Sequence, residues 1–169
     1  MTSRVLGAAR RAVAVLAIVL AQTALAQDGP AMPTDDDSRM QSDCLANAVE
    51  QSLPKSNCIG VVADACMKEP GNDSTVMMTA CLDRESRLWD DLLNDRYGLL
   101  MEALNEEQAI ALQSSQRAWI DMRDKTCAYE ASLWQGGTGA GPAAVGCFLR
   151  ETGWRALMLG DTLDFATGN

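Results

Sequence analysis

The feature that most constrains the fold is a helical repeat of apolar residues from about residue 74 to residue 134, interrupted at one place. Apolar side chains recur at steps of three, four and seven, which is typical of helices with one buried face. The interruption is at Asn105, where Gln108 three residues later predicts a capping box, and Glu106 and Glu107 suit the positive end of a helix dipole. So short a connection requires the two long helices, over about 74–104 and 106–134, to run antiparallel.

Further helical patterns flank this hairpin. Residues 143–163 predict a third helix whose apolar side carries Cys147, Phe148, Trp154, Leu157, Met158 and Leu159. Residues 38–52 predict a short helix that Pro54 ends, and residues 58–67 fit either a helix or a strand, with the alanines favouring a helix. We therefore expect one all-α helical domain over residues 38–169, a bundle of two long antiparallel helices, a third packed helix and short N-terminal helices.

The N-terminal segment has the pattern of a secretory signal peptide over residues 1–26. Arg4, Arg10 and Arg11 precede an apolar run over 12–20, and Ala24-Leu25-Ala26 fits a cleavage site before Gln27. The apolar run is too short to span a bilayer, so no stable membrane insertion is expected after cleavage. Residues 27–37, which end in Asp35–Asp37, predict a disordered acidic arm. We expect a periplasmic or secreted protein.

Export changes the interpretation of the cysteines, because an even count in an oxidising compartment favours disulfides. The chain has six: Cys44, Cys58, Cys66, Cys81, Cys127 and Cys147. No C-x-x-C pair and no histidine supports a zinc site. Spacing favours the pairs Cys44–Cys58, Cys66–Cys81 and Cys127–Cys147. The last pair is best supported because it staples a glycine-rich loop, whereas the first two pairs could exchange partners.

Charge and composition exclude several function classes. The chain has 14 basic and 23 acidic residues, and loss of the three leader arginines gives a net charge near −12. A nucleic-acid partner is excluded because a phosphate backbone requires a basic footprint. The absence of histidine excludes Ser-His-Asp and Cys-His catalysis, and no carboxylate pair stands out as catalytic, so no enzyme is predicted. The glycine-rich segment 136–141 lacks the Lys-Ser/Thr of a phosphate loop, and no cofactor is expected.

Polar residues on the apolar stripe of the second long helix require partners. Gln116 and Arg123 alternate there with Leu112, Trp119 and Cys127, and an unpaired buried charge is costly. The first long helix places Asp90, Asn94 and Tyr97 on one face. We predict an Asp90–Arg123 ion pair that fixes the helix register. Its neighbours in a structural polar network are Asn94, Tyr97, Gln116 and Arg155. The same residues could instead form a binding site.

Three motifs in order resemble a known family. Residues 90–97 match D-x-x-L-N-x-x-Y, and residues 112–127 match L-x-x-x-Q-R-A-W-I-x-x-R-D-x-x-C. Gly136-Gly137-Thr138, then Cys147, then T-x-x-R-A at 152–156 complete the pattern. Over about residues 74–160 the chain resembles the lysozyme inhibitor LprI-like N-terminal domain family, and residues 44–70 look like the cysteine-bearing extension of some bacterial members. Met158 stands where members often carry Glu, which puts a salt bridge at that end of the bundle in question.

The resemblance implies a small exported bacterial helical protein, periplasmic, that inhibits lysozyme and so protects peptidoglycan. An acidic mature chain would be attracted to a cationic lysozyme, in agreement with a protein partner of that kind. The alternative is an envelope scaffold or interaction module without lysozyme activity. Trp89 and Trp119 are expected in the core. The candidate partner-binding residues are the loop residues Trp134, Gly136, Gly137 and Thr138 and the carboxylates Asp121, Asp124 and Glu130.

Overall fold

The computed structural model describes residues 32–168, and all regular structure in this part of the chain is helical. The elements are α1 (Asp35–Glu50), a short 3-10 helix η1 (Lys55–Cys58), α2 (Val61–Met67), α3 (Thr75–Ala103), α4 (Glu106–Ser132) and α5 (Ala140–Thr167). The all-α fold is therefore confirmed, with helix ends within a few residues of those predicted. The predicted signal peptide, residues 1–26, lies outside the described residues.

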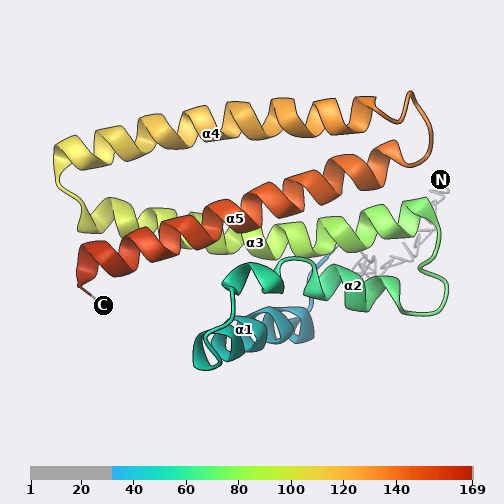
Figure 1. Cartoon of the computed structure of the whole chain (residues 1–169), viewed down its shortest axis with the longest axis horizontal. Coiled ribbons are helices and arrows are strands. Elements are labelled where there is room, and N and C mark those ends of the chain that lie inside the picture. The colour runs from blue at the N-terminus through green and yellow to red at the C-terminus, as the bar shows by residue number, and fades with distance from the viewer. Residues whose placement is uncertain (1–31, 169) are drawn as a thin grey trace, which may run out of the picture.

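Three long helices form the body of the molecule, and their packing order differs from the expected hairpin. α3 and α4 run antiparallel as predicted, but α5 packs along α3 while α4 contacts mainly α5 (Figure 1). Because α4 runs antiparallel to both α3 and α5, these two helices run parallel to each other. α1, η1 and α2 lie on the side of this body opposite α4 (Figure 1). The third helix, rather than the second, is thus the main partner of α3.

Polar side chains cap the N-termini of the first two long helices. Ser74 caps α3 by accepting a hydrogen bond from the Met77 amide at 3.2 Å. Asn105 and Gln108 form the predicted capping box, in which each side chain accepts the backbone amide of the other at 3.0 and 3.1 Å. These caps satisfy amides that the first turn of a helix leaves without partners.

The disordered acidic arm predicted for residues 27–37 is wrong at its C-terminal end; residues 27–31 lie outside the described part. Thr34 caps α1 in a capping box with Asp37, and Asp35–Asp37 form the first helical turn. The Asp37 carboxylate is also bonded at 2.7 Å by Arg84 of α3. Burial alone raises the pKa of Asp37, but the hydrogen bonds from Arg84 and Thr34 outweigh it and hold that pKa below its ordinary value. A carboxylate with these partners is fixed rather than solvated.

All six cysteines are paired, and each disulfide joins two elements. The bridges are Cys44–Cys58 between α1 and η1, Cys66–Cys81 between α2 and α3, and Cys127–Cys147 between α4 and α5. The three predicted neighbour pairs are therefore confirmed. Each closes a loop of 14 to 20 residues, for which the loop-entropy model gives a stabilisation of about 3 kcal/mol.

A buried carboxylate at the centre of the core was not predicted from the sequence. Glu85 of α3 has no exposed surface, and its oxygens accept the backbone amides of Gly60 and Ala63, each at 2.7 Å. One of them also accepts the indole N–H of the fully buried Trp89 at 2.8 Å. Glu85 therefore caps the N-terminus of α2 from the neighbouring helix, and fixes α2 and the turn before it against α3.

A pair of helix glycines gives opposite expected effects on stability. Alanine normally stabilises a helix interior by about 0.5–1 kcal/mol over glycine, and a Cβ at Gly98 meets nothing within 4 Å. A Cβ at the buried Gly153 would lie 2.8 Å from two side-chain atoms of Ile59, in the turn before α2. We expect Gly98→Ala to raise the free energy of unfolding by that amount and Gly153→Ala to lower it by about 1–3 kcal/mol. Urea unfolding followed by circular dichroism measures both, and equal effects would contradict the close packing.

Candidate functional site

The predicted polar network is only partly assembled. Gln116 is predicted beside Asp90 of α3, but it lies at the α4–α5 contact, where its side-chain oxygen accepts a 2.8 Å hydrogen bond from Arg155. Asp90 does not pair with Arg123, so that prediction is wrong: the exposed Asn94 amide donates to Asp90 at 3.1 Å, and Tyr97 packs against the core. The reason is that α5, rather than α4, packs along α3. The polar residues of α4 therefore contact α5.

Arg123 instead uses partners on α4 and α5. Its guanidinium bonds the adjacent Asp124 at 2.9 and 3.0 Å. It also lies over the rings of Trp119 and Phe148, at 4.8 and 5.0 Å from their centroids. Carboxylate and aromatic contacts both stabilise a guanidinium, so the charge on the stripe is satisfied without α3.

Arg155 of α5 is the most buried basic residue at the α4–α5 contact, with 7% of its surface exposed. Besides Gln116 it donates to the Ser115 hydroxyl at 3.2 Å, and no carboxylate within ion-pair distance accompanies it in the described part of the chain. One of its terminal nitrogens lies 4.0 Å from the Met158 sulfur, at the position where the resemblance led us to expect Glu. Burial lowers the pKa of this guanidinium.

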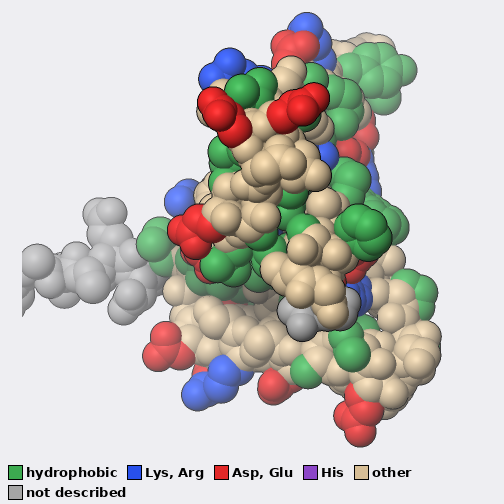
Figure 2. Space-filling model, turned by 90° about the vertical axis from the view of Figure 1, so that its left-hand side faces the viewer, with side chains coloured by type: hydrophobic (Ala, Val, Ile, Leu, Met, Phe, Trp, Pro, Cys, Tyr) green, Lys and Arg blue, Asp and Glu red, His purple; other side chains and the backbone are tan. Residues whose placement is uncertain are grey.

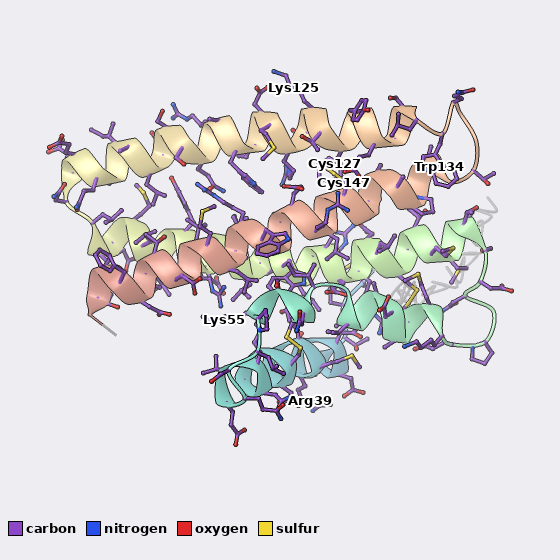
Figure 3. All side chains as sticks on the ribbon, viewed as in Figure 1. Arg39, Lys55, Lys125, Cys127, Trp134 and Cys147 are labelled. Atoms are coloured by element: carbon purple, nitrogen blue, oxygen red, sulfur yellow. A yellow bond between two sulfur atoms is a disulfide. The ribbon has the colours of Figure 1, made fainter. Side chains whose placement is uncertain are left out.

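The connection between α4 and α5 projects from one end of the bundle and carries the predicted loop residues. Trp134 lies in this connection, at the end of the bundle beyond the Cys127–Cys147 bridge (Figure 3). Trp134 is 54% exposed, and its ring covers Gly139, where a Cβ would lie 2.1 Å from a ring carbon. Gly136, Gly137 and Thr138 are exposed. The α4–α5 connection therefore presents an exposed aromatic side chain, Trp134, which is held in place by the loop residues that follow it.

This loop is shorter than predicted, because α5 begins at Ala140 rather than near Ala143. Pro142 falls in the first turn of α5, where a missing N–H costs no helical hydrogen bond. The connection predicted between the helices over 106–134 and 143–163 thus ends at Gly139. A shorter loop with an anchored aromatic ring loses less conformational entropy on binding than a flexible one.

The three candidate carboxylates on α4 each have a basic neighbour. Asp121 bonds Lys125 at 2.7 Å, and both lie on the outer face of the helix, from which Lys125 points away from α5 (Figure 3). Asp124 bonds Arg123, and Glu130 bonds Arg150 of α5 at 2.6 Å. Exposed pairs of this kind are weakly bound and can exchange partners, since they contribute at most about 1 kcal/mol each.

A pocket lies between α3 and the other long helices, and the sequence did not indicate it. It is an open pocket of about 520 Å³, which we call the α3 pocket; its α3 wall includes Asp83, Arg87, Asp90 and Asp91, and Arg123 of α4 also lines it. Asp90 and Arg123 therefore share a cavity without forming an ion pair. The spacing of these carboxylates on one face of α3 was visible in the sequence, but the opposite walls come from distant segments.

Comparison with known proteins identifies the family to which this arrangement belongs. The family model described as lysozyme inhibitor LprI matches residues 66–159, more than half of the chain. The chain belongs to the LprI lysozyme inhibitor family. The LprI segment begins at Cys66 of α2 and ends in α5, so it includes two of the three disulfides and both the α4–α5 loop and most of the α3 pocket.

The chain is also similar to one curated protein over part of its length. The chain is 31% identical over 96 residues to the protein named uncharacterized protein YecT of Escherichia coli K12. The match covers 50% of this chain and 59% of YecT. No solved structure is significantly similar to the chain.

The surface and the helices of this LprI protein can be described further. Acidic and basic side chains are both scattered over the end of the molecule that contains the α3–α4 turn (Figure 2). Within residues 32–168, no helix is both long enough and apolar enough to cross a membrane.

Proposed function

We propose that this LprI-family protein is exported to the periplasm or secreted, where its oxidised domain binds and inhibits a lysozyme. The observation that carries the proposal is the family match over residues 66–159. Export is supported by the leader pattern and by the pairing of all six cysteines, which is typical of oxidising compartments. Inhibition of this kind would protect peptidoglycan from hydrolysis.

Charge supports a cationic lysozyme as the partner. The chain without its leader carries a net charge near −12, and such a field accelerates encounter with a protein of opposite charge. The α4–α5 loop is the proposed contact. Tyr129 near the end of α4, and Leu133 and Trp134 directly after it, expose 63%, 60% and 54% of their surfaces. Tyrosine and tryptophan side chains are frequent binding anchors. Asp121, Asp124 and Glu130 are proposed to meet basic side chains at the rim of the partner.

A cell-wall turbidity assay tests the proposal directly. The oxidised protein is expected to slow lysis by a c-type lysozyme, and more strongly at low than at physiological salt, where the Debye length is about 8 Å. Lack of inhibition at a large molar excess and low salt would overturn the proposal and favour the alternative of an envelope interaction module. Reductant is expected to abolish inhibition.

Trp134 has a matched control elsewhere on the surface. Trp134→Ala is expected to weaken inhibition about 30-fold, since an aromatic anchor contributes roughly 2 kcal/mol to binding. Trp154 on α5 is exposed to nearly the same extent, 55% against 54%, but lies outside the loop, so Trp154→Ala is expected to leave inhibition unchanged. Titration of lysozyme activity gives both inhibition constants. Equal constants for wild type and Trp134→Ala would remove the loop from the contact surface.

A further inference from the structure

The α3 pocket contains a charge imbalance that its own side chains do not neutralise. Of its two arginines, Arg87 directs two nitrogens at Asp83, at 2.7 and 3.0 Å. Arg123 is occupied by Asp124 and by the rings of Trp119 and Phe148. Both guanidiniums are therefore already satisfied by groups other than Asp90 and Asp91.

Asp90 and Asp91 are the carboxylates of the pocket that have no basic partner. Neither forms an ion pair with any described residue, and Asp90 accepts one hydrogen bond, from Asn94. Both residues are exposed, so their carboxylates are accessible to a ligand. Adjacent unpaired carboxylates at the wall of a cavity attract a cation.

A hydroxyl group at the wall of the same pocket also has no hydrogen-bond partner. Thr152 of α5 lines the pocket at 2% exposure, and its side chain makes no hydrogen bond within residues 32–168. Within the described residues, Gln41 Nε2 is the buried side-chain nitrogen or oxygen that has no partner, and the Thr152 hydroxyl is not such a group. The unpaired hydroxyl is therefore accessible from the pocket that Thr152 lines. The cavity is the place from which a partner can come.

The remaining walls are apolar. Val145 and Phe148 of α5 and Pro33, which precedes α1, contribute to them. No group of three or more acidic, cysteine or histidine side chains among the described residues is arranged to hold a metal ion. A ligand that fits these walls therefore combines a cationic head that donates hydrogen bonds with an aliphatic body.

We propose that the α3 pocket receives an arginine side chain of the partner protein. The guanidinium would donate to Asp90 and Asp91, because its planar fork of N–H groups can bond two carboxylate oxygens at once, which an ammonium does less well. Its methylene groups would pack against Val145, Phe148 and Pro33. This inference rests on the proposed function in one respect, since it takes the arginine from a cationic lysozyme.

The chemistry of the pocket can be tested without lysozyme. In NMR titrations of the oxidised protein at low ionic strength, N-acetyl-arginine methylamide is expected to shift the amide signals of Ser86 and Phe148. The citrulline analogue, which has the same shape without the charge, is expected to bind about tenfold more weakly or less, as is an Asp90→Asn/Asp91→Asn variant. Asp95→Asn alters an exposed carboxylate of α3 outside the pocket and should bind like wild type. Equal binding of the arginine and citrulline compounds would overturn the inference, as would binding of the arginine compound by the double variant as strongly as by wild type.

Inhibition assays then separate this inference from the function on which it rests. Asp90→Asn/Asp91→Asn is expected to inhibit lysozyme about tenfold more weakly than wild type, with Asp95→Asn unchanged. A double variant as potent as wild type would overturn the docking of an arginine in the pocket and leave the inhibitor function standing. A wild-type protein that binds the arginine compound but does not inhibit lysozyme would overturn the function and leave the pocket chemistry standing.

Discussion

Replacing Glu85 with alanine is expected to lower the free energy of unfolding by about 3–5 kcal/mol. The fully buried carboxylate satisfies the amides of Gly60 and Ala63 and the indole N–H of Trp89. Truncation leaves these three donors without acceptors, and two of them, the Ala63 amide and the Trp89 indole, are buried. A buried donor without an acceptor costs about 1–3 kcal/mol. It also removes the cap of α2. Urea unfolding should show the loss, with circular dichroism reporting the helices and tryptophan fluorescence the surroundings of Trp89.

Two further variants identify the cause of that loss. Glu85→Gln keeps the shape and one accepting oxygen but turns an NH₂ group toward donors, so we expect a smaller loss than with alanine. Glu102→Ala removes an exposed carboxylate near the end of the same helix and should change stability by less than about 0.5 kcal/mol. An alanine variant at position 85 with stability close to that of Glu102→Ala would show that the three hydrogen bonds do not stabilise α2.

Local signals along the chain predicted the elements well. The capping box at Asn105 and the apolar periodicity placed the long helices, because both depend on residues within a few positions of each other. The disulfides followed from short spacing. The acidic arm failed for the converse reason, since what orders Asp37 is Arg84, a residue 47 positions away.

The packing of the long helices could not be derived from the same patterns. An apolar stripe shows which face of a helix is buried, but not which helix covers it. The stripe on α4 was correct, and Gln116 and Cys127 are its buried members, yet the partner is α5. Close approach of α5 to α3 at glycines such as Gly160, where a Cβ would lie 2.8 Å from the Arg96 guanidinium, favours this order, and that depends on atoms of distant residues.

The candidate site divides in the same way. The α4–α5 loop was visible in the sequence because composition and the Cys127–Cys147 spacing both indicated it. The α3 pocket was not, because its walls come from the residues before α1 and from three long helices. Glu85 was overlooked although it follows Cys81 and precedes Trp89 at helical spacing, a position that places an acidic residue on a buried face.

The Cys127–Cys147 bridge is expected to determine activity more than stability. A Cys127→Ala/Cys147→Ala variant should lose about 3 kcal/mol by the loop-entropy model. Only two residues of α4, Gln116 and Cys127, are buried. Apart from this bridge, its C-terminal half is held against α5 by half-exposed contacts such as the Arg123–Phe148 and Glu130–Arg150 pairs. We expect the amides of residues 120–132 to exchange faster with solvent, because local opening of α4 needs less free energy than unfolding of the α3–α5 core.

The Cys44–Cys58 bridge provides a matched control, because it closes a loop of 14 residues and lies outside the family-matched segment. Its removal should cost a similar free energy of about 3 kcal/mol and leave lysozyme inhibition intact. Removal of Cys127–Cys147 should abolish most inhibition, because it frees the loop that carries Trp134. Hydrogen exchange and the turbidity assay on both variants separate the two roles. If both variants lost inhibition in proportion to their stability, the loop would have no special part in binding.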